Sequence, residues 1–84
     1  MKKIIVYSKT YCPYCDRAKA LFEHKGVAFE EINLDGKHEE LSELVAKTKM
    51  RTVPQIFIGD EFIGDFSELK ALDDKGELDQ KLAN

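Results

Sequence analysis

Two cysteines separated by two residues limit what this chain of 84 residues can be. Cys12 and Cys15 are the only cysteines in the sequence. Small proteins that rely on disulfides for stability usually carry four or more cysteines, and a bridge across two residues closes too small a loop to restrain the unfolded chain much. The pair therefore indicates thiol chemistry, since a structural disulfide here would add little stability and would expose a reducible bond.

Two other uses of a C-x-x-C pair fit the sequence poorly. Covalent haem attachment needs a histidine directly after the second cysteine, and that position is Asp16. A structural zinc site needs four ligands, but only His24 and His38 are available to join the thiols, and neither has a finger-like spacing from them. We therefore expect no metal site.

Length and charge narrow the class of protein further. A chain of 84 residues is below the usual size of one domain, so we expect a single domain, residues 1–84. Lys and Arg number 13 against 16 Asp and Glu, a formal net charge of −3 with the two signs interspersed, which argues against nucleic acid or an anionic membrane as the main partner. The first apolar run, residues 4–7, is too short for a signal peptide or a membrane span. Together with the cysteine motif, this predicts the reducing cytoplasm as the location.

The pattern of apolar residues predicts an α/β fold that begins with a βαβ unit. β-Branched and aromatic residues favour short strands, and apolar positions at helical spacing favour the helices between them. Pro13 suits a first helical position and Gly26 a helix end. We expect strands at 4–7 and 27–34 and helices at 13–25 and 38–47.

The second half of the chain predicts a ββα unit. Residues 53–58 and the short segment 62–63 are expected to be strands, and the glycine of Gly59-Asp60 suits a tight hairpin between them. Ser67 is expected to cap a final helical layer that is interrupted at residues 73–76. The predicted fold is thus βαβ followed by ββα, a four-stranded mixed sheet flanked by helices.

The position of the cysteines at a helix start makes the two thiols different. Residues three apart on a helix are neighbours, so the bond between Cys12 and Cys15 can open and close without refolding. The unpaired amides and the positive dipole end of the helix stabilise a thiolate on Cys12. We expect Lys9, Arg17 and Lys19 to strengthen this bias. Cys12 is therefore the predicted nucleophile and Cys15 the resolving thiol.

Four segments carry a resemblance to a known family. They are Tyr11-Cys12-Pro13-Tyr14-Cys15, Arg17-Ala18-Lys19-Ala20-Leu21, Thr52-Val53-Pro54-Gln55-Ile56-Phe57-Ile58 and Ile63-Gly64. Together they resemble the glutaredoxin family, in its dithiol class with Cys-Pro-Tyr-Cys. The resemblance implies a thioredoxin fold and a cis peptide bond between Val53 and Pro54, a form almost confined to proline.

The resemblance also implies a glutathione site beside Cys12. The backbone of Val53 would pair with the cysteinyl part of glutathione, with Thr52 and Pro54 on either side of it. Tyr14 would pack beside the sulfur. Lys9, with Arg51 as a second charge, would hold the glycine carboxylate.

The other end of glutathione, its γ-glutamyl carboxylate, is assigned by the resemblance to the segment Gly64-Asp65-Phe66-Ser67. Amides at the start of the helix that follows would hold this anion. Asp65 stands where the family usually has a second glycine, so it adds bulk and a negative charge near the carboxylate. We expect this departure to affect the affinity for glutathione and to leave the thiol chemistry unchanged.

The function implied is that of a glutathione-dependent thiol–disulfide oxidoreductase. Its partners would be glutathione, as co-substrate, and disulfide-containing or glutathionylated proteins, with ribonucleotide reductase as one candidate. We expect a monomer with no bound cofactor.

Two alternatives stay open. One is an electron donor reduced by thioredoxin reductase, for which Asp65 leaves room, although the Trp-Ser-Gly-Phe segment of such redoxins is absent from the sequence. The other is a carrier of a [2Fe–2S] cluster held with glutathione between two subunits, which Pro13 disfavours.

Overall fold

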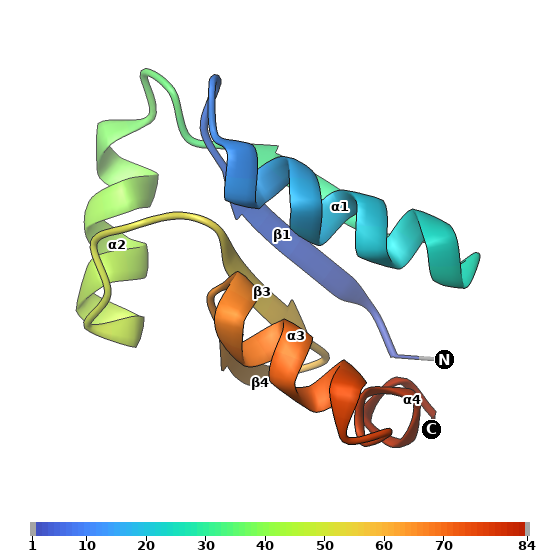
Figure 1. Cartoon of the computed structure of the whole chain (residues 1–84). Coiled ribbons are helices and arrows are strands. Elements are labelled where there is room, and N and C mark those ends of the chain that lie inside the picture. Colours follow the sequence, from blue (N-terminus) through green and yellow to red (C-terminus); the bar gives the residue numbers. More distant parts are fainter. Residues whose placement is uncertain (1, 84) are drawn as a thin grey trace.

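A four-stranded mixed sheet organises the chain in the computed structural model, which describes residues 2–83 (Figure 1). The strands lie in the order β2-β1-β3-β4, with β1 parallel to β2 and antiparallel to β3, and with β3 antiparallel to β4. The predicted βαβ and ββα units are confirmed. The elements are β1 (Ile4–Ser8), α1 (Pro13–Lys25), β2 (Glu30–Asn33), α2 (His38–Thr48), β3 (Gln55–Ile58), β4 (Glu61–Gly64), α3 (Phe66–Asp74) and α4 (Leu78–Leu82).

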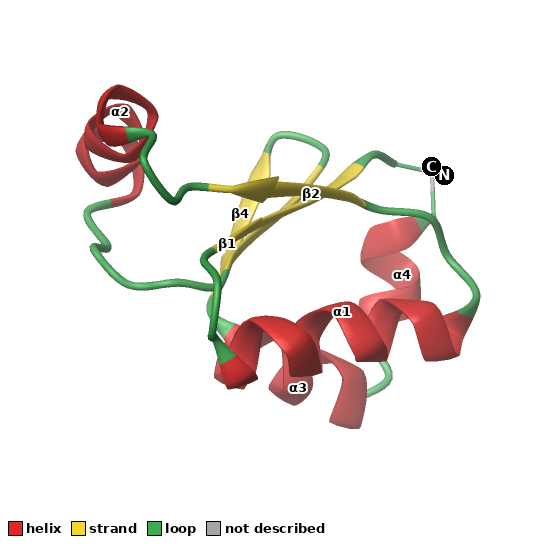
Figure 2. Cartoon of the chain, turned by 90° about the horizontal axis from the view of Figure 1, so that it is seen from above, coloured by secondary structure: helices red, strands yellow, loops and turns green. Residues whose placement is uncertain are grey.

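Helices cover the two faces of the sheet unequally. Figure 2 shows α1 and α3 side by side under one face, whereas α2 lies at one end of the sheet. Ile4 and Val6 of β1 are fully buried beneath α1 and α3, but the alternate residues Ile5 and Tyr7 are only half-buried. The first strand is therefore fully buried on one face and only half-buried on the other. A smaller apolar cluster around Leu44 and Phe57 covers that face.

The second strand begins three residues later than expected, at Glu30. Helix α1 ends at Gly26, whose φ of 72° lies in the left-handed region that glycine tolerates. The amide of Val27 then donates to the carbonyl of Phe22 at 3.2 Å and closes the end of the helix. Val27 and Phe29 still pack against the core, but they do so from the loop.

The cap of α3 is Asp65, so the prediction that Ser67 caps this helix is wrong. Asp65 has an extended backbone, and its side chain accepts a hydrogen bond from the amide of Glu68 at 3.1 Å. Ser67 lies inside the first turn, where its hydroxyl cannot act as the cap.

No helix among residues 2–83 combines the length and the apolar character that a bilayer crossing requires.

One buried polar side chain holds the loop between α2 and β3. Gln55 is 0% exposed, and its amide nitrogen donates to the carbonyls of Met50 and Thr52, both at 2.9 Å. Its amide oxygen accepts from the Thr48 hydroxyl at 2.8 Å. The two carbonyl contacts fix the backbone directly before Val53, whose peptide bond to Pro54 is cis as predicted.

We predict that Gln55→Leu lowers the free energy of unfolding by about 2 kcal/mol, because Thr48 and the two loop carbonyls lose their partner. Urea denaturation measures this change. The matched control is Gln80→Leu at an exposed position of α4, which should stay within about 0.5 kcal/mol of wild type. Equal effects at the two positions would contradict the assigned role of Gln55.

Candidate functional site

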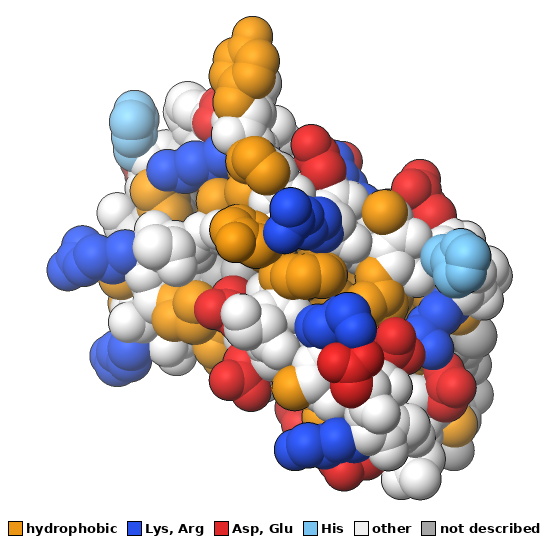
Figure 3. Space-filling model, in the orientation of Figure 1, with side chains coloured by type: hydrophobic (Ala, Val, Ile, Leu, Met, Phe, Trp, Pro, Cys, Tyr) orange, Lys and Arg blue, Asp and Glu red, His pale blue; other side chains and the backbone are white. Residues whose placement is uncertain are grey.

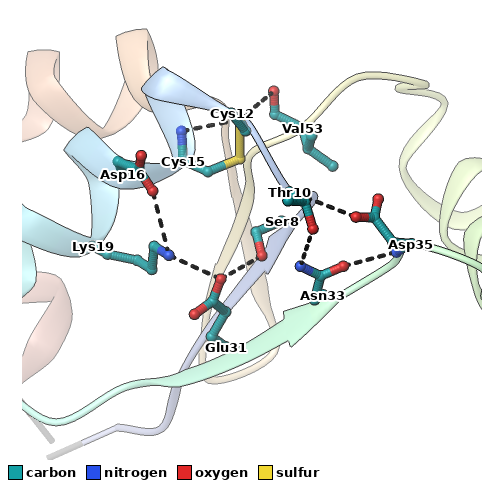
Figure 4. Close-up of polar contacts among 10 residues, drawn as sticks. All are labelled: Ser8, Thr10, Cys12, Cys15, Asp16, Lys19, Glu31, Asn33, Asp35 and Val53. Carbon is teal, nitrogen blue, oxygen red and sulfur yellow. Dashed lines mark hydrogen bonds and ion pairs between the residues drawn. A yellow bond between two sulfur atoms is a disulfide. The ribbon is translucent and has the colours of Figure 1, made fainter.

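The two cysteines lie at the amino end of α1 and are joined in a disulfide (Figure 4). Cys12 is the N-cap of the helix and Pro13 its first residue, as predicted. The Cys12 sulfur accepts a hydrogen bond from the Cys15 amide at 3.1 Å. The unpaired amides and the positive dipole end of the helix are thus directed at this sulfur, where they stabilise a thiolate once the disulfide is reduced.

The two sulfurs differ in their access to solvent. Cys15 is 1% exposed on the inner side of α1, whereas Cys12 is half-buried and reaches the surface. The Cys12 sulfur lies 3.9 Å from the carbonyl oxygen of Val53. Of the pair, Cys12 is therefore the sulfur that an incoming disulfide meets first.

A cleft of about 260 Å³ opens beside Val53 and so next to the Cys12 sulfur. It brings together residues from the start of α1, the loop before β3 and the start of α3. Its lining residues are Tyr14, Thr52, Val53, Pro54, Asp65, Phe66 and Ser67. Apart from Asp65, each of these was expected to contact glutathione.

Three other predicted contact residues lie outside the cleft lining. Lys9 is half-buried in the segment between β1 and α1. Arg51 is exposed and lines a different hollow, against α2. Gly64 is buried at the end of β4 with a φ of 119°, and a β-carbon there would come within 3.0 Å of the Glu68 side chain. Its role in this structure is to let the chain turn into α3.

Aromatic rings form one wall of the cleft. The ring centroids of Tyr14 and Phe66 lie 6.2 Å apart, and the Arg17 guanidinium lies over the Tyr14 ring at 5.0 Å. Arg17 is therefore placed on the aromatic wall. Lys19 was expected to favour the Cys12 thiolate, but its ammonium is paired with Glu31 at 2.9 Å and Asp16 at 3.5 Å, so much of its charge is balanced locally.

The start of α3 supplies the polar side of the cleft. Helix starts carry unpaired amides that bind anions, and Phe66 and Ser67 occupy the first two positions of α3. The Asp65 carboxylate already occupies the next amide, that of Glu68. A carboxylate bound at this end of the cleft would therefore lie beside another carboxylate.

A polar network that joins the buried Ser8 to two side chains nearer the surface lies beneath the start of α1 (Figure 4). The fully buried Ser8 hydroxyl donates to the Glu31 carboxylate at 2.6 Å, and Lys19 donates to the same oxygen. These two donors, Ser8 first, hold the pKa of Glu31 below its ordinary value of 4.5. Glu31 in turn raises the pKa of Lys19. No local sequence pattern predicts this network, because its members come from β1, α1 and β2.

A second polar contact ties down the segment that carries Cys12. The amide of Thr10 donates to Asp35 at 3.0 Å, and Asn33 donates to the Thr10 hydroxyl at 3.3 Å. Thr10, first through its side chain and then through its amide, lowers the pKa of Asp35. The sequence signal at this position is the Asp35-Gly36 pair, which is typical of a turn and gives no indication of a contact with Thr10.

The sheet order and the dithiol at a helix start define a thioredoxin-like protein of the thiol–disulfide oxidoreductase class. Residues 4–63 match the family model described as Glutaredoxin. The chain is 46% identical over 83 residues to Glutaredoxin from Pseudomonas aeruginosa, covering 99% of each chain. It is 45% identical over 82 residues to Glutaredoxin 3 from Escherichia coli strain K12, covering 98% of this chain and 99% of that one.

Solved structures agree with the sequence relatives. The crystal structure of a buckwheat glutaredoxin–glutathione complex has a TM-score of 0.91 and 36% identity, covering 96% of this chain and 76% of the other. The crystal structure of wheat glutaredoxin has a TM-score of 0.91 and 38% identity, with coverage of 96% and 78%. The chain belongs to the glutaredoxin family, whose members are thiol–disulfide oxidoreductases that use glutathione.

The network of Ser8, Glu31 and Lys19 predicts a pH dependence of stability. Because folding lowers the pKa of Glu31, its carboxylate contributes stability that is present above pH 4.5 and is lost as the pH falls through the lowered value. Glu31→Gln should therefore cost about 1 kcal/mol at pH 7, and its difference from wild type should shrink at pH 3. Urea denaturation at the two pH values measures both effects.

The control for this prediction is Glu30→Gln on the same strand. Glu30 pairs with Lys3 at 3.1 Å, but both side chains are more than half exposed. Its substitution should change the free energy of unfolding by less than about 0.5 kcal/mol at either pH. A Glu31→Gln difference that does not vary with pH would contradict the assignment.

Proposed function

We propose that this protein reduces protein disulfides and glutathionylated thiols, taking its electrons from glutathione. The observation that carries the proposal is the position of the Cys12 sulfur, which is at once the cap of α1 and the neighbour of the cleft beside Val53. A thiolate stabilised at a helix start is both nucleophilic and a good leaving group in disulfide exchange. The buried partner, Cys15, is suited to resolve the mixed disulfide that forms on Cys12.

The reaction with a protein disulfide has two exchanges. The Cys12 thiolate attacks one substrate sulfur, so a mixed disulfide forms and the other substrate sulfur leaves and takes up a proton. The Cys15 thiol then loses its proton and attacks Cys12, which releases the second substrate thiol and forms the Cys12–Cys15 disulfide present in the structure. Two molecules of glutathione restore the dithiol and leave as glutathione disulfide.

A glutathionylated thiol needs only the first cysteine. Cys12 attacks the glutathione sulfur, the target thiol leaves, and a second glutathione resolves the mixed disulfide on Cys12. The proposed contacts are the Val53 backbone for the cysteinyl part and the amides of Phe66 and Ser67 for the γ-glutamyl carboxylate. Tyr14 would cover the sulfur. The glutathione complex of the buckwheat relative supports this use of the cleft.

The remaining proposed contacts concern charge at the other end of glutathione. Lys9 would hold the glycine carboxylate, and Arg51 would join it after a rotation away from its present hollow against α2. Both are long, flexible cations: Arg51 directly precedes Thr52 in the chain, and Lys9 lies three residues before Cys12. Gly64 contributes through the backbone turn that sets the start of α3.

We further propose that the protein works in the cytoplasm as a monomer without a bound cofactor. Glutathione is its co-substrate, and ribonucleotide reductase is a candidate among its protein substrates.

Asp65 favours a second candidate function, that of an electron donor reduced by thioredoxin reductase, because its carboxylate opposes the anionic end of glutathione. A coupled assay of mixed-disulfide reduction, run with glutathione and glutathione reductase or with thioredoxin reductase alone, separates the two. Turnover with thioredoxin reductase and none with glutathione and glutathione reductase would overturn the first proposal.

The division of labour between the cysteines predicts the behaviour of Cys15→Ser. This variant should retain reduction of the mixed disulfide of glutathione and 2-mercaptoethanol and lose glutathione-coupled reduction of a protein disulfide. Oxidation of NADPH by glutathione reductase measures both activities. Cys12→Ser, the control, should lose both. Retention of protein-disulfide reduction by Cys15→Ser would show that Cys15 does not resolve the mixed disulfide.

The position of Asp65 predicts that removing its charge improves the use of glutathione. Asn caps a helix about as well as Asp, so Asp65→Asn keeps α3 intact and removes one negative charge. Two unit charges about 4 Å apart repel by about 1 kcal/mol in water, so the KM for glutathione should fall about fivefold. Steady-state kinetics with varied glutathione test this. An unchanged KM would mean that the carboxylate of glutathione binds away from Asp65.

A further inference from the structure

Two large hydrophobic side chains are exposed among residues 2–83, and both flank the nucleophile. Tyr11 is 98% exposed and Tyr14 is 55% exposed, and they lie directly before Cys12 and two positions after it. Figure 3 shows hydrophobic side chains gathered over the start of α1 and between α1 and α3, with one projecting beyond them. Covering an exposed aromatic ring with a partner lowers the free energy of the system. The two tyrosines therefore indicate contact with a molecule that approaches Cys12.

The two tyrosines serve different parts of that approach. Tyr14 lines the cleft and contacts Phe66, so a ligand in the cleft covers it. Tyr11 is absent from the cleft lining, and at 98% exposure its ring packs on no part of the described chain. A glutathione molecule seated in the cleft therefore leaves Tyr11 uncovered, and only a larger substrate extends over it.

The backbone explains why the ring of Tyr11 points away from the core. Its φ is 59°, in the left-handed region that side chains other than Gly, Asn and Asp rarely adopt. The loop does not need the ring for its shape, since Thr10 is held by Asp35 and Cys12 caps the helix. A bulky ring thus occupies a strained turn without stabilising it, which points to a role in binding.

We propose that Tyr11 docks the polypeptide that carries the target disulfide, which deepens the proposed function by making protein disulfides the favoured substrate class. The ring covers an apolar segment beside the target cysteine while the Cys12 sulfur meets the disulfide. This is a binding role, outside the exchange chemistry. Small glutathione mixed disulfides, for which the cleft beside Cys12 is the proposed site, gain nothing from Tyr11.

The test compares Tyr11→Asn and Tyr11→Phe on two substrates. Asn tolerates the left-handed backbone, so Tyr11→Asn removes the ring and keeps the turn. With insulin as the protein disulfide and dithiothreitol as the reductant, its KM should rise at least about fivefold, which is the effect of losing an aromatic anchor of about 1 kcal/mol. Its kinetics with the mixed disulfide of glutathione and 2-mercaptoethanol should be unchanged. Tyr11→Phe should restore the wild-type KM for insulin.

The matched control is Lys49→Asn at the end of α2. Among residues 2–83, Lys49 is the other non-glycine residue with a positive φ, 65°. Its substitution should alter neither activity. Equal losses on both substrates in Tyr11→Asn, or no loss on either, would overturn the docking role. The insulin arm takes its electrons from dithiothreitol, so it reports on Tyr11 even if glutathione fails to support the mixed-disulfide arm. If wild type fails to reduce the mixed disulfide with glutathione, the proposed function is overturned and the docking role of Tyr11 is still tested by the insulin assay.

Discussion

The packing of α1 on β1 sets the position of everything at the site. Ala18 and Phe22 of the helix are fully buried against Ile4 and Val6 of the strand, so the helix can neither slide nor rotate without opening the core. This packing leaves the start of α1 at the surface and directs the inner side of its first turn toward the core. Cys12 is thereby presented to a substrate while Cys15 is kept under the helix, and the chemical difference between two identical thiols follows from where a helix begins.

Polar side chains then bring distant segments to Cys12. Gln55 shapes the loop before Val53, and Asp35 and Asn33 hold the loop that carries Thr10. These are neutral or single-charge hydrogen bonds, each modest in free energy, but each joins backbone that would otherwise be free to move. The cleft therefore has walls from three separate parts of the chain, fixed relative to one sulfur.

Asp65 caps α3, and in the proposed glutathione site the same carboxylate opposes binding. Its carboxylate caps α3 by accepting a hydrogen bond from the Glu68 amide, and this places a negative charge at the end of the cleft proposed to hold the γ-glutamyl carboxylate. Glycine at this position would cap less well and leave the amides free for a ligand. The same physical feature, the unpaired amides of a helix start, thus stabilises a thiolate at α1 and is partly used up at α3.

The sequence by itself determined the dithiol at a helix start and the βαβ and ββα units, because helix starts, hairpins and apolar periodicity are local signals. The residues expected to line the cleft came from the resemblance to the glutaredoxin family, not from any local pattern. The sequence indicated Ser67 as the cap of α3, whereas the cap in the structure is Asp65; both are good capping residues two positions apart, so residue type alone does not separate them. The contact of Ser8 with Glu31 and Lys19, and the uncovered ring of Tyr11, depended on the tertiary structure. Strand register and helix packing decide which distant side chains meet, and no local pattern encodes that pairing.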